Sequence, residues 1–359
     1  MASGALGALL ALGAVGPARA DDAAPADGDL ELGGRVVVRE QLAQEDDAAW
    51  TAGLALEDAR LQAEYRRGKR VEVVVELGAK RNVSLKDAYL ELRLKKRLKL
   101  RAGQFKLPTS ALHNTSRWKL PTIDRGASTD VLDDGLGVIG RRVGAQLAWE
   151  GKGECAPRVA LAAFQTTTGG GPDQGLLVDD QAGLDVVVRG ELGATGGLAV
   201  GATASSRLAL DPVTADRRRL WAVGVDAVTD RAVAGGQLRL WAEAHLGSLH
   251  LDATPATAAT PRFVVGRALA AWRHGGAIDG APYLEPFVGG AVMDVNLDDA
   301  GDRLAELSVG INAGRWDEWR VQLQGDLGRV GDDVPAGIVG GLSAPPDRLA
   351  VTLQLGATF

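Results

Sequence analysis

The chain ends on Leu349-Ala350-Val351-Thr352-Leu353-Gln354-Leu355-Gly356-Ala357-Thr358-Phe359. Apolar side chains occupy every second position, and small or polar side chains occupy the positions between them. Strict alternation places one apolar row on a single face of a β-strand. About ten residues is the length that a tilted strand needs to cross the hydrocarbon core of a membrane. The stretch therefore predicts a membrane-crossing strand.

The terminal Phe359 falls in the apolar phase of this strand. A last strand that ends on phenylalanine resembles the segment that bacterial outer-membrane barrels present to their assembly machinery. The pattern predicts outer-membrane lipid as the surroundings and that machinery as a partner.

The other end of the chain predicts export. Residues 5–15 are an apolar run that is followed by Gly16, Pro17 and the small-x-small site Ala18-Arg19-Ala20. This order is typical of a cleavable signal peptide. We expect a signal peptide over 1–20, a short acidic lead over 21–32 and an outer-membrane β-barrel over 33–359.

Composition narrows the class of protein further. The chain has 48 glycines, 4% aromatic residues and a formal net charge of −6, which argues against nucleic-acid binding. Beyond the leader, no apolar run reaches the 18 or so residues of a membrane-spanning helix. The single cysteine excludes an intramolecular disulfide framework. Histidine, cysteine and carboxylate residues do not cluster at metal-ligand spacing, so we expect no metal and no cofactor.

Segments of alternating hydrophobicity fill the remainder of the chain. We expect sixteen strands, at 33–43, 54–67, 69–78, 85–95, 97–106, 139–150, 157–167, 182–193, 196–207, 217–229, 234–247, 261–273, 282–294, 302–314, 317–329 and 347–359. The connections after even-numbered strands are mostly short, whereas those at 44–51, 168–181, 297–302 and 330–347 are longer and acidic. Transmembrane barrels join short periplasmic turns to long extracellular loops in this manner. The pattern predicts an antiparallel barrel with both termini in the periplasm.

Aromatic residues supply a further signal for the membrane boundary. They fall at the expected periplasmic ends of strands, where an interfacial girdle would lie: Tyr65, Trp149, Trp272, Tyr283, Trp319 and Phe359. The alternative is a soluble all-β protein, either a lectin-like sandwich or a β-solenoid. A solenoid would show a fixed internal period, and this sequence has none.

The polar phase of the strands predicts which side chains line the lumen. Inward candidates include Arg60, Asp87 and Arg142, and most lumen charges are solvated or paired wall residues. The longest connection, from Lys106 to about Val138, follows the fifth strand. It carries Trp118, Leu120 and Ile123, which could pack against a wall, and the cations Arg117, Lys119 and Arg125, which could face water. Inward folding of this loop would narrow the lumen and concentrate anions. The alternative is an ordinary surface loop.

Several motifs over 54–150 resemble the phosphate-selective porin family (Porin O and P). They are Asp87-Ala88-Tyr89-Leu90-Glu91-Leu92, Leu100-Arg101-Ala102-Gly103-Gln104-Phe105-Lys106, Thr115-Ser116-Arg117-Trp118 with Asp124-Arg125, and Gly140-Arg141-Arg142-Val143-Gly144. The resemblance implies a sixteen-stranded outer-membrane barrel, a homotrimer, and a third extracellular loop that folds inward as a constriction. It also implies an anion site at Asp87 and Arg125, with Arg117 in place of a basic residue before Trp118.

One departure from that family lies in the second strand. Where the family usually offers paired arginines, this chain has Glu57-Asp58 before Ala59-Arg60-Leu61. Two carboxylates would reverse the local field and remove bidentate phosphate donors, and Arg60, on the same face as Asp58, cannot restore both charges.

The sequence thus predicts a porin for passive diffusion of small hydrophilic solutes, with a preference for anions at a constriction formed by Arg117, Lys119, Arg125, Asp87, Arg60 and Arg142. Alternatives are a general or non-phosphate-selective porin and a plugged structural barrel. A remoter alternative is an outer-membrane hydrolase that uses His245, Ser248 and His250. Because positions 245 and 248 differ in strand parity, we expect a protein that is not an enzyme.

Overall fold

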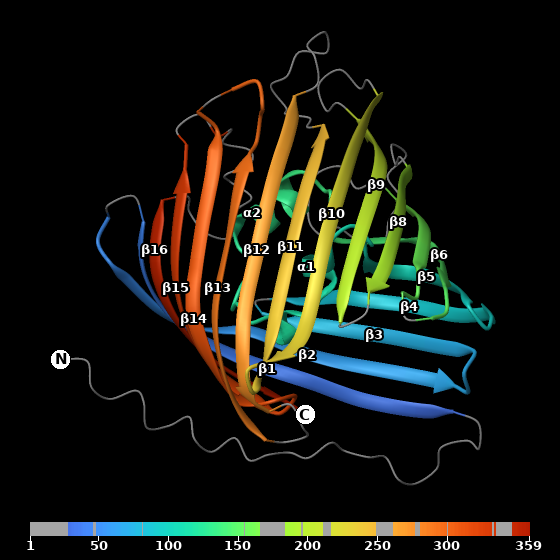
Figure 1. The fold of residues 1–359 in the computed structure, drawn as a ribbon, viewed down its shortest axis with the longest axis horizontal. Helices are drawn as coiled ribbons and strands as arrows, with labels where there is room; N and C mark the ends of the chain where they lie inside the picture. Colours follow the sequence, from blue (N-terminus) through green and yellow to red (C-terminus); the bar gives the residue numbers. More distant parts are fainter. Residues whose placement is uncertain are drawn as a thin grey trace.

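The computed structural model describes residues 28–45, 48–80, 82–153, 155–165, 184–194, 197–210, 217–248, 261–276, 281–299, 301–331, 334 and 347–359. The predicted signal peptide and the loop at 168–181 lie outside these residues. Sixteen strands form one closed antiparallel barrel in sequence order (Figure 1). They are β1 (Asp29–Glu45), β2 (Thr51–Arg67), β3 (Val71–Ala79), β4 (Val83–Lys95), β5 (Leu98–Lys106), β6 (Arg141–Glu150), β7 (Arg158–Gln165), β8 (Leu184–Ala194), β9 (Leu198–Leu210), β10 (Arg217–Val233), β11 (Gly236–Ser248), β12 (Arg262–Gly275), β13 (Pro282–Asp294), β14 (Arg303–Arg315), β15 (Trp319–Val330) and β16 (Arg348–Thr358).

The predicted terminal strand closes the barrel. As β16 it pairs with β15 on one side and with β1 on the other, and Arg35 lies opposite Thr358. Leu349, Val351, Leu353 and Leu355 are 37–45% exposed, whereas the alternate Ala350, Thr352 and Gln354 are at most 4% exposed. The apolar row therefore faces outward to lipid, and the polar row faces the lumen. The fold class predicted from alternation is confirmed.

Strand boundaries differ from the prediction by a few residues. The largest shifts are four residues: β1 begins at Asp29 rather than at residue 33, and β10 ends at Val233 rather than at residue 229. Leu30 and Leu32 continue the outward row of Val36 and Val38, so β1 extends into the predicted acidic lead. The start of β1 pairs with the end of β2, and Phe359 is hydrogen-bonded to Gly34 of β1. The start of β1 and the terminal Phe359 therefore lie at the end of the barrel that carries the short turns. Short turns are periplasmic in such barrels.

The predicted aromatic girdle requires one correction. Trp149, Trp319 and Phe359 are 40–44% exposed on the outer surface near this end. Tyr283 is only 5% exposed, and its ring lies 5.2 Å from the guanidinium carbon of Arg273 and beside Trp316. Its parity on β13 is that of the lumen residues. Tyr283 is therefore a lumen residue and not part of the lipid-facing girdle.

The connection between β5 and β6 runs inside the barrel. It contains the helical turns α1 (Ala111–Asn114), η1 (Arg117–Lys119), α2 (Ala127–Asp130) and η2 (Val131–Gly135). Figure 1 shows α1 and α2 behind the strands of the wall, within the lumen. We call residues 107–140 the constriction loop. The prediction that it folds inward is confirmed. None of the described helices is long and apolar enough to cross a bilayer.

Candidate functional site: the lumen constriction

The constriction loop is held against one side of the barrel, which we call the anchor wall (β10–β16). Leu112 and Leu120 pack with Trp241, Leu269, Ala271 and Phe287. A second cluster joins Val131, Leu132, Leu136 and Ile139 of the loop to Phe263, Val265, Met293, Val295 and Leu304. The expected wall packing of Trp118, Leu120 and Ile123 is observed, since these side chains are 7%, 1% and 3% exposed. Apolar packing therefore fixes most of the loop.

Polar side chains of the anchor wall bind the backbone of the loop. Arg320 donates to the carbonyl oxygens of Trp118 (2.7 Å), Leu120 (3.0 Å) and Arg117 (3.2 Å). Asn312 and Gln322 both donate to the carbonyl oxygen of Pro121. These contacts give the buried loop carbonyl groups hydrogen-bond donors in place of the water that they lose when the loop folds inward. The inward arginines of this wall thus have a structural role.

Carboxylates of the same wall receive donors from the loop. Glu243 accepts hydrogen bonds from the Ser110 hydroxyl (2.7 Å) and the Leu112 backbone N–H (3.3 Å). Glu306 accepts from the Ala127 backbone N–H and the Ser128 hydroxyl, both at 2.6 Å. These bonds fix α1 and α2 at their N-terminal ends, where an anion is favoured.

On its other side the loop borders a cavity of about 370 Å³. We call the facing strands, β2–β6, the open wall. Six cationic and two acidic side chains line the cavity: Arg60, Arg101, Lys106, Arg117, Arg125 and Arg141 with Glu76 and Asp87. Tyr89, Phe105, Ser116 and Gln146 are among the remaining lining residues. The excess of positive charge gives this space an anion-attracting field.

Most cations of the open wall are held by carboxylates. Asp87 accepts two parallel hydrogen bonds from Arg141, each 3.0 Å long. Arg101 donates to Glu91 at 2.7 Å. Such pairing with a carboxylate orients a guanidinium group and offsets part of its positive charge. These residues form the fixed part of the lining.

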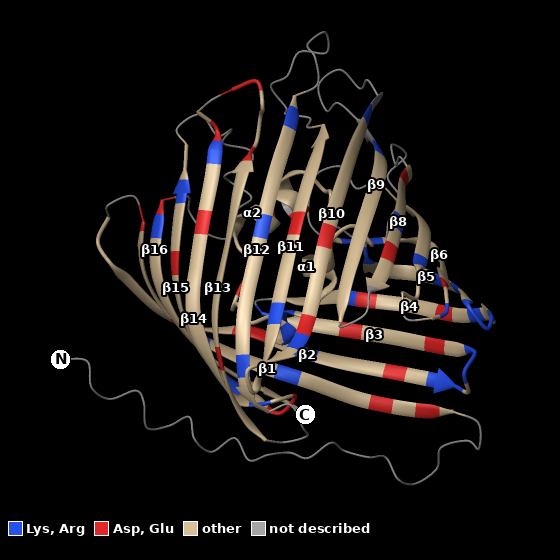
Figure 2. Ribbon diagram, in the orientation of Figure 1, with Lys and Arg blue, Asp and Glu red and all other residues tan. Residues whose placement is uncertain are grey.

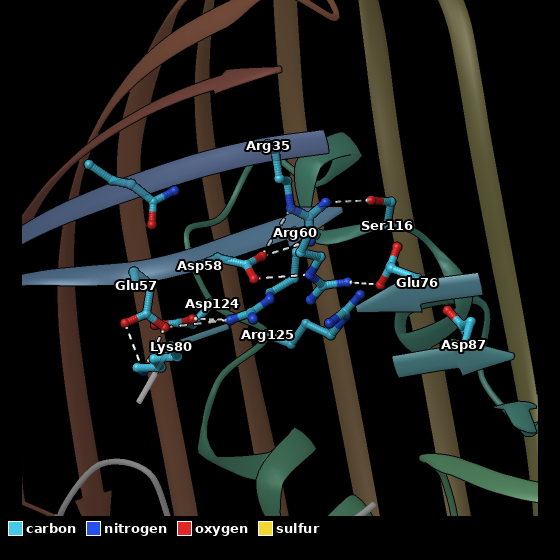
Figure 3. Close-up of polar contacts among 12 residues, drawn as sticks. Arg35, Glu57, Asp58, Arg60, Glu76, Lys80, Asp87, Ser116, Asp124 and Arg125 are labelled. Carbon is cyan, nitrogen blue, oxygen red and sulfur yellow. Dashed lines mark hydrogen bonds and ion pairs between the residues drawn. The ribbon is translucent and has the colours of Figure 1, made fainter. Parts of the chain in front are cut away.

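A β-bulge explains how two adjacent carboxylates both reach the lumen. Val37 pairs with Asp58 and Val38 pairs with Leu56, so Glu57 is the extra residue of β2. Both carboxylates are buried inside the barrel, whereas regular alternation would place one of them in lipid. Asp58 bridges Arg35 and Arg60, as Figure 3 shows. Glu57 lies 2.8 Å from Lys80 and within 4 Å of Arg39 and Arg117. The two carboxylates therefore neutralise wall cations.

Two cations of the cavity have a different environment. Arg125 donates to the carbonyl oxygens of Leu112 (3.3 Å) and Thr115 (2.5 Å). Lys106 donates to the carbonyl oxygens of His113 (2.7 Å) and Asn114 (3.4 Å). Within the described part of the chain, neither side chain is hydrogen-bonded to a carboxylate. Both side chains line the cavity.

The electrostatics of the loop fit this distinction. Burial, followed by repulsion from Arg117 and Arg141, lowers the pKa of Arg125 to about 9, which leaves it protonated at pH 7. Burial opposes ionisation of Asp124, but Arg39 and Arg117 outweigh it and hold the pKa of this carboxyl below its usual value. Asp124 accepts from both arginines, at 2.8 Å and 3.3 Å. Arg117 is therefore a neutralised cation, whereas Arg125 is not.

Of the six residues predicted for the constriction, four line the cavity and two do not. Arg60, Asp87, Arg117 and Arg125 line the cavity, and Lys119 and Arg142 are not among its lining residues. Lys119 is exposed and its carbonyl oxygen accepts a bond from Arg239. Arg142 donates to Gly137 and lies 3.9 Å from Asp185. The functional roles of all six stay predictions.

Three lining cations were absent from the predicted site, namely Arg101 within β5 and the two residues Lys106 and Arg141 at the ends of the loop. Lys106 ends β5 and Arg141 begins β6, directly opposite each other. Strand parity is a weak guide at strand ends, where the chain leaves the sheet. The signal that could have found Lys106 and Arg141 is their position at the two ends of the long loop, because a loop that folds inward brings its ends to the constriction.

The residues of the hydrolase alternative do not form a catalytic arrangement in the described part of the chain. His245 lies in the lumen, with Nε2 3.6 Å from Glu243. The Ser248 hydroxyl accepts from the Trp221 backbone N–H at 2.9 Å, at the end of its strand. His250 lies outside the described residues. Among the described residues, no group of three His, Cys, Asp or Glu side chains is arranged to hold a metal ion.

Comparison with known proteins places this geometry in context. Residues 51–211 match the family described as phosphate-selective porin O and P. The resemblance seen in the motifs is thereby confirmed over that region, as is location in the bacterial outer membrane. No curated protein sequence matches the chain.

Solved structures share the fold at low sequence identity. The outer membrane channel DcaP of Acinetobacter baumannii has a TM-score of 0.65 at 13% identity, over 94% of this chain and 99% of that chain. The anion-selective porin from Comamonas acidovorans has a TM-score of 0.60 at 10% identity, over 93% and 100%. The trimer form of the outer membrane protein OmpT of Vibrio cholerae has a TM-score of 0.57 at 11% identity, over 93% and 100%. These likenesses support the barrel fold.

Proposed function

We propose that this outer-membrane barrel, which matches the phosphate-selective porin O and P family over residues 51–211, is a water-filled porin that prefers small anions. The observation that carries the proposal is the cavity between the constriction loop and the open wall, with its six cations and two carboxylates. Solutes pass this cavity because the anchor wall is covered by the loop. The name of the Comamonas porin, which is anion-selective, supports the same preference.

Phosphate selectivity is not part of the proposal. Glu57 and Asp58 pair with guanidinium groups near the constriction, and Asp87 accepts hydrogen bonds from two N–H groups of Arg141. A phosphate ion would find two cations, Arg125 and Lys106, that have only carbonyl partners among the described residues. This supports a path for anions in general, with one short segment where an anion contacts Arg125 and Lys106.

Single-channel recording in planar bilayers under a potassium chloride gradient tests the proposal. The expected result is a stable conductance with a reversal potential that has the same sign as the chloride equilibrium potential. Reversal at the sign set by potassium would contradict the anion preference. Absence of conductance from folded, heat-modifiable protein would favour a plugged structural barrel.

A homotrimer is proposed as the assembled form. The named trimer form of the Vibrio cholerae protein and the shared barrel fold support it. Light scattering of the purified protein, corrected for detergent, should give about three times the mass of one chain. A mass of one chain that is independent of detergent would contradict the trimer.

A further inference from the structure

Two neighbouring turns at the periplasmic end of the barrel carry a group of exposed cations. Arg67 ends β2, and Lys69 and Arg70 follow it in the turn before β3; Lys95 ends β4, and Lys96 and Arg97 follow it in the turn before β5. We call these six residues the basic turns. Figure 2 shows them as two blue ends of the open wall. Arg93 of β4, two residues before Lys95, donates its backbone N–H to the carbonyl oxygen of Arg70 at 2.8 Å, which holds the first turn against the end of β4.

The basic turns differ from the other cations of the same strands. Arg60 is bridged to Asp58 and Glu76, and Arg101 is bridged to Glu91. Across the described residues, no ion pair links any of the six turn cations to a carboxylate. All but Arg97 are exposed. On a chain whose formal net charge is −6, this local excess of positive charge calls for an anionic partner from outside.

The position of the turns relative to lipid identifies that partner. Trp149, which is 40% exposed on the outer surface, pairs with Leu98 one residue beyond Arg97. Leu94 is 52% exposed and immediately precedes Lys95. Exposed aromatic and apolar side chains mark the edge of the hydrocarbon region. Cations directly beyond that edge lie at the depth of lipid headgroups, where long side chains extend toward phosphate.

We propose that the basic turns bind the phosphodiester headgroups of anionic phospholipids in the periplasmic leaflet of the outer membrane. Arginine and lysine donate charge-assisted hydrogen bonds to phosphate oxygens, and two adjoining turns present several donors along one stretch of the barrel rim. An acidic protein could match the charge, but it would leave the neighbouring apolar side chains unexplained. The surface lies outside the cavity lining, so this proposal stands independently of ion selectivity.

Native mass spectrometry of the full barrel with phosphatidylglycerol or phosphatidylcholine tests the proposal. The test variant combines Lys69→Glu, Arg70→Glu, Lys95→Glu and Lys96→Glu. The wild type should retain phosphatidylglycerol about tenfold better than phosphatidylcholine, and the variant should lose this preference. A second variant with glutamine at the same four positions should lose most of it. Heat-modifiable migration reports that each barrel is folded.

The matched control combines Lys152→Glu, Arg158→Glu, Arg231→Glu and Arg315→Glu, which makes the same change in net charge at other turns of this end. It should keep the preference. Equal lipid retention by wild type and test variant would overturn the proposal, and so would an equal loss in the control. Displacement of the lipid by millimolar inorganic phosphate or by polyglutamate would also overturn it, because the surface would then serve free anions or acidic proteins.

Discussion

The two sides of the lumen differ in what their polar side chains contact. On the anchor wall, Arg320, Asn312 and Gln322 bind carbonyl oxygens of the constriction loop. On the open wall, Arg60 and Arg141 face a cavity. Both sets come from the same inward phase of alternating strands. We therefore expect an inward arginine of this barrel to act on solutes only where the constriction loop leaves the wall uncovered.

The largest effect is expected from removing an anchor. Arg320→Met removes the guanidinium donor from three loop carbonyl groups, of which, among the described residues, only that of Arg117 keeps another donor, the Leu120 backbone N–H. Hydrogen bonds to a charged group contribute about 1.5–3 kcal/mol each, so the attached loop should lose about 3 kcal/mol or more. We expect a wider, noisier channel with weaker anion preference in single-channel records. Arg315→Met, an exposed position on the neighbouring strand, is the control. Unchanged conductance in R320M would contradict the role of the anchor wall.

The next effect separates two adjacent arginines. Arg141→Gln frees the carboxylate of Asp87 inside the cavity, which changes the local charge by removing a cation and exposing an anion. We expect the chloride-to-potassium permeability ratio to fall severalfold. A fall of this size corresponds to a loss of about 1 kcal/mol in the electrostatic interaction between chloride and the cavity. Arg142→Gln, which alters a residue outside the cavity lining, should leave the ratio within error. An equal change in both variants would remove the distinction between lining and supporting residues.

Much of the fold could be predicted because strand alternation is a local property. Each strand carries its own apolar row, and Leu349, Val351 and Leu353 report the lipid face without knowledge of any partner strand. The register irregularity at Glu57 could not be predicted, because it depends on pairing with Val37 and Val38 of another strand.

The site was only partly predictable for a similar reason. Arg117 and Arg125 were expected from the loop motifs, and both line the cavity. Lys119 was expected beside them, but η1 turns its side chain elsewhere, since residues of a tight helical turn point in different directions. The choice between Arg141 and Arg142 depends on where β6 begins, directly after Gly140 with its φ of 112°. That geometry is set by contacts distant in sequence.

A smaller effect is expected from the carboxylates of the bulge. Replacing Glu57 and Asp58 with Gln and Asn removes the partners of Arg35, Lys80 and, in part, Arg117. More positive charge then reaches the lumen, and we expect anion preference to rise about twofold to threefold, since paired charges near water interact weakly. Reversal potentials under the same gradient measure it. A Glu191→Gln control, near exposed Arg158, should have no effect. A fall in anion preference would contradict the neutralising role.

The smallest effect is a dependence of loop attachment on pH. Burial, reinforced by Arg125 and Lys106, holds the pKa of His113 well below its ordinary value. In the attached loop His113 therefore stays neutral, whereas a released loop protonates it below about pH 6.5. Protonation favours the released state, so attachment should weaken as pH falls, by at most about 1.4 kcal/mol per pH unit. Channel noise should rise between pH 7 and pH 5, and His113→Leu should reduce that rise. Identical pH profiles would exclude this origin.

We infer that a solute meets Arg125 and does not meet Lys119, although both are cations of the constriction loop. The most direct measurement compares the reversal potentials of Arg125→Glu and Lys119→Glu in the same salt gradient. The two variants carry the same change in net charge. The structure predicts that R125E loses anion preference or becomes cation-selective, whereas K119E stays close to the wild type. Equal shifts in both variants, or a larger shift in K119E, would contradict the account.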